Sequence, residues 1–225
     1  MGDRTAKDAL YEALAGVAKA IGSGRRAEIV DLLAQGERPV EDVAHEIEQS
    51  VANTSHHLRT LARAGLVQSR REGTRIWYRL ASDDVAELWS AMRRVAADHV
   101  AGVEALARAY LGGGEGVEPV TRTELAHRLD AGDVAVIDVR PRQEFDAGHV
   151  VGARSVPIDE LEADLDSLSA GEDIVAYCRG PYCVYADDAI RLLRENGLEA
   201  RRLEDGFPEW RRAGLPVAVG EGTPS

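Results

Sequence analysis

The chain has 225 residues, enough for one large domain or for two of roughly 110 residues each. Its 44% hydrophobic and 5% aromatic residues are typical of a globular protein. No apolar run approaches the ~20 residues that a membrane-spanning helix needs, and the first residues show no secretory signal. We therefore expect a cytoplasmic protein with no membrane association, whose cysteines are reduced thiols rather than a structural disulfide.

The net charge of −12 is unevenly distributed. Residues 1–111 have 15 lysines and arginines against 16 acidic residues, whereas residues 112–225 have 12 against 23. Residues 51–80 nevertheless hold six arginines and a single acidic residue, Glu72. A solvated helix face is one explanation, but six like charges with one counter-charge favour an anionic partner.

The clearest boundary is LGGGEGVEP, residues 111–119. Three consecutive glycines and a proline interrupt periodic segments on both sides, which is typical of a flexible linker. We therefore expect a first domain at residues 1–111, a glycine-rich linker at 112–118, a second domain at 119–220 and a frayed tail at 221–225.

Apolar residues recur at helical spacing in the first part of the chain, which predicts helices at residues 6–21, 24–35, 38–47 and 51–64. Gly22, Gly36 and Gly65 follow three of these segments, where glycine commonly ends a helix. Pro39 suits the first turn of the third helix, and Ser50 is a good N-cap for the fourth.

Residues 66–80 alternate around REGT, which predicts a β-hairpin with Gly73 in its turn. Residues 83–111 are predicted to form one long final helix. Two helices joined by a tight turn and followed by a basic hairpin define a winged helix-turn-helix, a mainly α fold. Its second helix, residues 51–64, would lie in the major groove of DNA.

Several side chains of this predicted domain are candidates for contact with DNA. Because Leu58, Leu61 and Leu66 must face the core, other positions of helix 51–64 are left for base edges and phosphates. Arginines on the hairpin suit phosphates or the minor groove, and one of the two adjacent histidines is expected to point sideways. The candidates are Asn53, Thr54, Ser55, His56, His57 and Arg59 on the helix and Arg70, Arg71 and Arg75 on the hairpin.

The stretch SVANTSHHLRTLARAGLV, followed by REGTRIWYRL, resembles the ArsR family of winged-helix repressors over essentially residues 8–105. The resemblance implies double-stranded operator DNA as partner and a homodimer formed through the first and last helices. Metal-sensing members carry cysteines in the third helix, and this chain has none there. Asp98 and His99 are adjacent, so they cannot face one metal as residues three or four apart do. We expect no metal site and no cofactor.

Helical and strand patterns alternate after residue 119, which predicts an α/β domain with a mainly parallel sheet. Thr121 and Glu124 form a capping-box pattern at its start. The predicted order is a helix at 121–132, a buried strand at 134–140, a helix or turn at 163–169, a buried strand at 173–178, a helix at 184–197, and a strand with a short helix at 198–217.

The chain's two cysteines, Cys178 and Cys183, lie where the second of these buried strands meets a helix. Open α/β folds bind ligands at that position. Loop N–H groups and the positive end of the helix favour a thiolate there, and Arg179 adds a cation. Buried packing is the alternative, but a packed strand would not need the tight turn at Gly180 and Pro181.

Three motifs, VIDVRPRQEFDAGHVVGARSVP, IVAYCRGPYC and LEDGFPEWRRAGLPV, resemble the rhodanese (sulfurtransferase) domain across residues 119–217. The resemblance implies that Cys178 accepts a sulfane sulfur as a persulfide, cradled by a six-residue loop of the sulfur-transfer type. The cradle residues are Gly180, Pro181 and Tyr182. Four further residues match the family pattern and are expected to form structural ion pairs and turns: Asp138, Arg140, Glu144 and His149.

Two departures from the rhodanese pattern suggest a different use of the loop. Pro181 removes one N–H donor from the cradle, and Cys183 stands where thiosulfate-using members often have a cationic or hydroxyl side chain. A Cys183 thiolate can attack a persulfide on Cys178, release hydrosulfide and close a disulfide, or the pair can hold a bridging sulfur.

These features predict a DNA-binding repressor whose rhodanese domain senses a sulfane-sulfur donor or a thiol oxidant through Cys178 and Cys183. One alternative is an active thiosulfate or persulfide sulfurtransferase that the DNA-binding domain localises or regulates. Another is a sensor of a thiol-binding ligand such as arsenite, which two thiolates can chelate.

Overall fold

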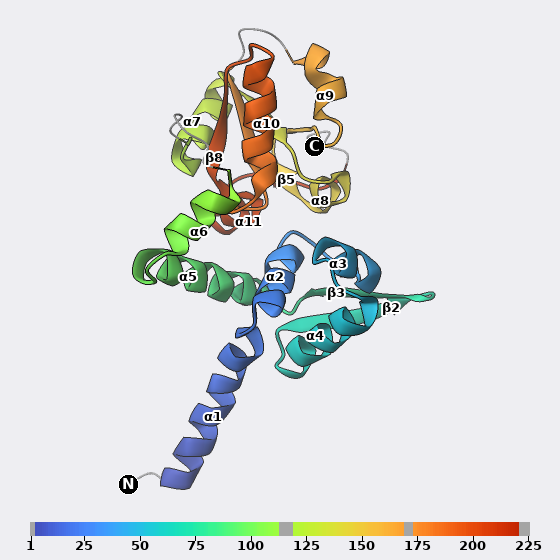
Figure 1. Cartoon of the computed structure of the whole chain (residues 1–225), viewed down its shortest axis with the longest axis vertical. Helices are drawn as coiled ribbons and strands as arrows, with labels where there is room; N and C mark the ends of the chain where they lie inside the picture. Colours follow the sequence, from blue (N-terminus) through green and yellow to red (C-terminus); the bar gives the residue numbers. More distant parts are fainter. Residues whose placement is uncertain (1–2, 113–118, 169–172, 221–225) are drawn as a thin grey trace. The chain divides into compact units, whose positions relative to one another are not determined.

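The computed structural model describes residues 3–112, 119–168 and 173–220 of the chain. It divides into two compact units, Met1–Asp98 and His99–Ser225, whose elements are shown in Figure 1. Most of the predicted linker, residues 113–118, and the predicted tail, residues 221–225, lie outside the described residues. No helix in the described part of the chain is long and apolar enough to cross a membrane.

The first unit is a winged helix-turn-helix, as predicted. Its elements are α1 Arg4–Ile21, α2 Gly24–Leu33, β1 Arg38–Pro39, α3 Val40–Glu46, α4 Val51–Arg63, β2 Val67–Glu72, β3 Arg75–Leu80 and α5 Asp83–His99. Ser50 caps α4, because its side chain accepts a hydrogen bond from the backbone N–H of Asn53. Gly73 has a φ of +60° in the turn between β2 and β3, a conformation that glycine adopts without strain.

The predicted start of the third helix was wrong by two residues. Arg38 and Pro39 are extended and form β1, which pairs antiparallel with β3 opposite Tyr78 and Trp77. Pro39 is therefore the N-cap of α3 rather than part of its first turn. The wing is consequently the outer part of a three-stranded sheet of order β1-β3-β2.

The single long helix predicted over residues 83–111 was also wrong. It is two helices, because α5 ends at His99 and α6 spans Val103–Tyr110. Gly102 between them has a φ of +90°, a left-handed conformation that no α-helix interior contains. The apolar spacing continues through this break, so periodicity alone did not reveal it.

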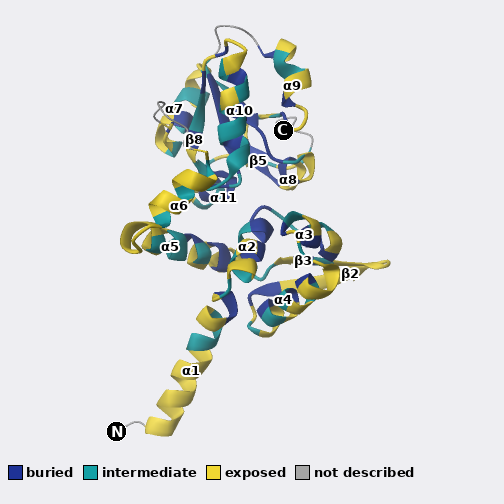
Figure 2. Ribbon diagram, viewed as in Figure 1, coloured by how far each residue is buried: buried dark blue, intermediate teal, exposed yellow. Residues whose placement is uncertain are grey.

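The core of the first unit lies where α2, α3 and α4 meet. Leu58, Leu61 and Leu66 are buried there, as the sequence predicted. They pack in one cluster with Ile29 and Val30 of α2. Figure 2 shows this buried interior, in contrast to the mostly exposed α1. Packing on one side of α4 leaves its other side for solvent or for a partner.

The second unit is built on a parallel sheet of order β6-β4-β7-β8, which confirms the predicted α/β class. Its strands are β4 Ala135–Asp138, β6 Arg154–Ser155, β7 Ile174–Cys178 and β8 Ala200–Gly206, with a separate antiparallel pair, β5 His149–Val150 and β9 Val217–Ala218. Its further helices are α7 Arg122–Ala131, α8 Arg142–Ala147, α9 Leu161–Asp164, the 3-10 turn Leu165–Ser167, α10 Val184–Glu195 and α11 Phe207–Arg212.

Strand β7 is buried on both faces, as its continuous apolar run predicted. Ala176 and Cys178 pack in one cluster with Ala186 and Ala189 of α10. Tyr177, which alternates with them, belongs to a second cluster that includes side chains of α7 and α11. The strand thereby delivers Cys178 to the carboxyl end of the sheet, immediately before α10.

Candidate DNA-binding surface and cysteine loop

The α4 helix presents a polar face that the sequence identified for the most part. Asn53, His56 and Arg59 are exposed, and Ser55 and His57 are partly exposed. These side chains alternate at helical spacing with Leu58 and Leu61, which face the core.

Thr54 is an exception and must be removed from the predicted DNA-facing set. Its side chain is 0% exposed, because it shares the buried side of α4 with Leu58, four residues later. Its hydroxyl oxygen has no hydrogen-bond partner. The sequence could not show this, because threonine is common on both faces of such helices.

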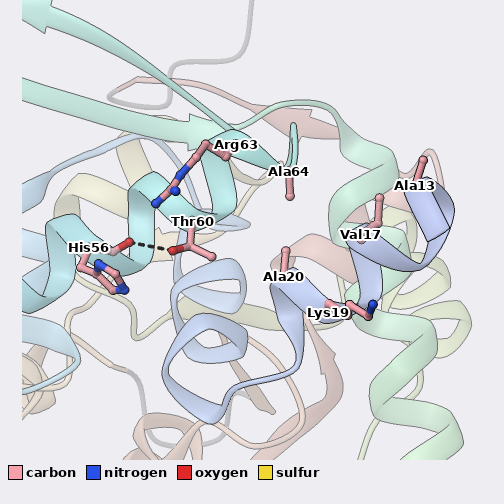
Figure 3. A pocket seen from close by; sticks show the side chains of 9 residues that line it. Ala13, Val17, Lys19, Ala20, His56, Thr60, Arg63 and Ala64 are labelled. Atoms are coloured by element: carbon pink, nitrogen blue, oxygen red, sulfur yellow. Dashed lines mark hydrogen bonds between the residues drawn. The ribbon is translucent and has the colours of Figure 1, made fainter. Parts of the chain in front are cut away.

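The two histidines of α4 differ in their surroundings. Burial lowers the pKa of His57, and the positive charges of Arg26, His56 and Arg25 lower it further, so this ring is neutral at pH 7. His56 is exposed and lines a pocket of about 680 Å³ between α1 and α4. Figure 3 shows His56, Thr60 and Arg63 on the α4 side of this pocket, and Val17 and Ala20 among the side chains of α1.

The three wing arginines are exposed but are not equivalent. Arg70 forms ion pairs with Glu37 and Glu72, at 2.7 and 2.6 Å, and its guanidinium lies over the ring of Trp77. The hydrogen bonds that Arg70 donates to these carboxylates, to Glu37 above all, raise the pKa of Arg70. Arg71 donates to the backbone oxygen of Gly73 in the hairpin turn. The charge of Arg70 is therefore largely balanced within the domain.

In the second unit, Cys178 and Cys183 are joined by a disulfide. This is the oxidised form of the pair, whereas the sequence led us to expect reduced thiols. A turn in which the N–H of Cys183 donates to the oxygen of Gly180 brings the two Cα atoms to 6.3 Å, within the usual range for a disulfide. Cys178 is 1% exposed, and Cys183, the N-cap residue of α10, is partly exposed.

Arg179 follows Cys178 and was expected to supply a cation to the loop. Its guanidinium instead donates to the carboxylate of Glu144, with 2.8 Å between Nε and Oε1, and lies over the ring of Tyr185. The side chain of Glu144 is only 2% exposed. Much of the charge of Arg179 is therefore balanced by an anion from α8.

A second cation reaches the loop from β8, and sequence reasoning missed it. Arg202 donates to the backbone oxygen of Pro181 at 3.1 Å and forms an ion pair with Asp187 of α10 at 2.7 Å. It stands far from the cysteines in the sequence, and its only signal was the expectation that β8 lies in the same parallel sheet as β7.

The backbone of Gly206 lies directly against the backbone of the cysteine loop. A Cβ atom at this position would lie closer than 3.0 Å to the backbone of Arg179 and of Gly180. Its φ of −123° suits any residue, so the glycine is required by space and not by conformation. The sequence marked this glycine only as part of the LEDGFPEW motif.

Asp138 and Arg140 form a fully buried ion pair at 2.6 Å. Burial opposes the charge on Arg140, but the adjacent Asp138 carboxylate raises its pKa. Arg140 also donates to the backbone oxygen of Gly148 and lies over the ring of Phe207. This pair therefore holds the chain between β4 and β5 in place.

His149 and Tyr177 are buried, like Asp138 and Arg140. The ring of His149 stacks on Phe145, and its Nδ1 lies 2.9 Å from the Phe145 backbone oxygen. The Tyr177 hydroxyl accepts a hydrogen bond from the N–H of Val150. Burial, and then the charge of Asp138, raise the pKa of Tyr177 well above its usual value, so this phenol stays protonated.

The chain combines a winged helix-turn-helix with a parallel α/β domain, and the α/β domain carries a cysteine loop at the carboxyl end of its inner strand β7. This combination defines a DNA-binding regulator with a rhodanese-like domain. The family model described as "Bacterial regulatory protein, arsR family" matches residues 23–69. The model described as "Rhodanese-like domain" matches residues 121–213. The HTH-type transcriptional regulator Rv0324 of Mycobacterium tuberculosis is 48% identical over 219 residues, covering 97% of this chain and 96% of that protein. The chain belongs to the ArsR family of transcriptional regulators and carries a C-terminal rhodanese-like domain.

Two of the solved structures similar to this chain each cover somewhat less than half of it. The homodimeric winged helix-turn-helix DNA-binding domain of Mb0332 from Mycobacterium bovis is 46% identical, with a TM-score of 0.41, and covers 44% of this chain and 91% of that one. The rhodanese-like domain of the Anabaena protein Alr3790 is 30% identical, with a TM-score of 0.42, and covers 48% of this chain and 86% of that one.

Proposed function

We propose that this regulator is a repressor whose cysteine loop senses reactive sulfur species or thiol oxidants. The observation that carries the proposal is the disulfide between Cys178, at the end of β7, and Cys183, at the start of α10. A pair of this kind can be oxidised and reduced reversibly, which a sensor requires. The pair lies in the rhodanese-like unit. The DNA-binding unit has a hydrophobic core of its own, separate from the core clusters of the rhodanese-like unit.

The proposed chemistry begins with the reduced pair. The Cys178 thiolate attacks the outer sulfur atom of a sulfane-sulfur donor, the bond between that sulfur and the rest of the donor breaks, and the rest leaves with the electron pair. Cys178 is then a persulfide. The Cys183 thiolate then attacks the Sγ atom of Cys178, the bond to the outer sulfur breaks, and hydrosulfide leaves with the electron pair. The product is the disulfide of the structure. The N-terminus of α10 stabilises the thiolates.

The first unit supplies the output by binding operator DNA. Among the exposed or partly exposed side chains of α4, Asn53, Ser55 and Arg59 are proposed to contact base edges and phosphates. Arg71 and Arg75 on the wing are proposed to contact phosphates, which adds affinity but little sequence preference. Arg70 contributes less, because Glu37 and Glu72 already balance its charge.

We propose that the DNA-binding form is a homodimer that pairs α1 and α5. Large apolar side chains on α1, Leu10, Tyr11 and Leu14, are 58–61% exposed. Val95 on α5 is similarly exposed. A symmetric dimer would bury these faces and present two α4 helices to a roughly palindromic operator.

A variant comparison tests the sensing proposal. Wild-type protein and the Cys178→Ser variant are reduced, treated with polysulfide and titrated with promoter DNA. We expect the two reduced proteins to bind equally and only the wild type to change its affinity after treatment. An equal change in both proteins would show that the signal enters elsewhere.

The rhodanese-like domain match supports a second candidate, a working sulfurtransferase. Steady turnover of thiosulfate and cyanide, unaffected by DNA, would favour it. The burial of Cys178 and the missing N–H of Pro181 weigh against efficient turnover.

A further inference from the structure

We propose that Cys183 is the modification site at which low-molecular-weight thiolates, including hydrosulfide, attack the oxidised loop, with Cys178 as the leaving group. The inference rests on the proposed function in one respect, that the disulfide is a working state of the protein. It assigns unequal roles to the two cysteines: Cys183 is partly exposed at the boundary of a core cluster, and Cys178 is buried within that cluster.

In the oxidised loop, the surroundings of Cys178 disfavour attack on its sulfur by a nucleophile from solvent. The residue is 1% exposed and packs with Ala186 and Ala189 of α10 in the core cluster. The backbone of Gly206 lies against the loop immediately after it, so closely that a Cβ atom there would collide with Gly180. Thiol–disulfide exchange depends on access to the sulfur that is attacked, so this burial disfavours attack at Cys178.

Cys183 is less buried than Cys178, although it packs against the same core cluster. It is partly exposed and is the N-cap residue of α10, where its side chain makes no capping hydrogen bond. The positive end of α10 attracts an approaching thiolate.

The exchange step needs no oxidant or reductant other than the incoming thiolate. A thiolate RS⁻ forms a bond to the Sγ atom of Cys183, and the bond between the two Sγ atoms breaks. Its electron pair leaves on Cys178, which becomes a thiolate in the loop. With glutathione the product is a mixed disulfide on Cys183, and with hydrosulfide it is a Cys183 persulfide. A second thiolate can then release the adduct and complete the reduction.

The sequence allows a direct test, because trypsin cuts between Arg179 and Gly180 and separates the two cysteines into peptides 155–179 and 180–191. Oxidised full-length protein is mixed with glutathione, quenched in acid at short times, alkylated with N-ethylmaleimide and digested. We expect glutathione on peptide 180–191 and N-ethylmaleimide on peptide 155–179, in about tenfold or greater excess over the reverse pattern. Equal labelling, or glutathione mainly on peptide 155–179, would overturn the assignment.

A second measurement decides the question if the mixed disulfide does not accumulate. The reduced variants Cys178→Ser and Cys183→Ser each keep one thiol, and their rates with 5,5′-dithiobis(2-nitrobenzoate) can be compared. We expect Cys183 in the first variant to react about tenfold faster than Cys178 in the second. Equal or reversed rates would contradict the proposal.

The two proposals fail in different ways. Glutathione on Cys178 would overturn the assignment of the attacked sulfur but leave sensing intact, provided that DNA affinity still changes on oxidation. Glutathione on Cys183 with unchanged DNA affinity would overturn sensing and leave the site assignment standing.

Discussion

The guanidinium of Arg179 is bound to the buried carboxylate of Glu144, 2.8 Å away, although Arg179 directly follows Cys178. We predict that Arg179→Ala lowers the free energy of unfolding of the rhodanese-like unit by about 3 kcal/mol, because it leaves a buried carboxylate without its main counter-charge. The double variant Arg179→Met, Glu144→Gln should recover most of this loss. Urea unfolding followed by circular dichroism measures both. Equal losses in the single and double variants would show that the pair is not the cause.

Gly206 is predicted to be essential for the geometry of the cysteine loop. Gly206→Ala places a methyl group against the backbone of Gly180, so the loop must move. We expect a loss of stability of about 1–3 kcal/mol and slower disulfide formation. Gly16→Ala is the control, because a Cβ atom there meets no atom within 4 Å and α1 should gain slightly in helix stability. Disulfide formation at the wild-type rate in Gly206→Ala would refute this role.

Thr54 and Asn53 are neighbours on α4 with opposite expected effects. Thr54→Val replaces a buried hydroxyl that has no partner, so it should raise stability by about 1 kcal/mol and leave DNA affinity unchanged. Asn53→Ala should weaken DNA binding without a large change in stability, since Asn53 is exposed. Thermal unfolding and fluorescence anisotropy on promoter DNA measure the two effects. Weaker DNA binding in Thr54→Val at unchanged stability would return Thr54 to the contact surface.

Arg71 on the wing is predicted to contact a phosphate. Arg71→Ala should weaken binding to all DNA sequences alike and reduce the slope of log K against log salt by about one. Arg4→Ala is a matched control, because Arg4 is an exposed arginine of α1 that pairs with Asp8. An unchanged slope in Arg71→Ala would remove this residue from the phosphate contacts.

Asp173 joins α7 to β8 through ion pairs with Arg128 and Arg201, at 2.6 and 2.9 Å. Burial alone would raise its pKa, but the hydrogen bonds from these two arginines outweigh it, so the pKa lies below its usual value. The stability contribution is therefore complete above the unfolded pKa of about 4 and is lost as pH falls through the lower folded value. We expect Asp173→Asn to cost about 1 kcal/mol at pH 7 and progressively less in acid. A cost that is independent of pH would contradict this assignment.

The sequence was sufficient to predict both folds, because helix caps such as Ser50, the hairpin turn at Gly73 and the buried run of β7 are local signals. It failed where tertiary contacts decide. The helical spacing of apolar residues continues past Gly102, although the helix is interrupted there. Strand β1 exists only because β3 pairs with it, and its two residues carry no strand pattern.

The cysteine pair and its six-residue loop, Cys178 through Cys183, were visible in the sequence, but the partners of the loop were not. Arg179 looked like the loop cation because it is adjacent, whereas the structure pairs it with Glu144, 35 residues earlier. Arg202 contacts the loop from the neighbouring strand β8. Such relationships depend on strand order and on side-chain direction, which a single sequence does not specify.

The most direct test of the central proposal combines two readings on one sample. Reduced protein is titrated with fluorescent promoter DNA before and after a polysulfide donor, and its intact mass is recorded at each stage. We predict a mass gain of one or more sulfur atoms, or a loss of two hydrogens, together with a changed DNA affinity. A modified mass with unchanged affinity would contradict it, because the cysteine loop would then have no influence on DNA binding.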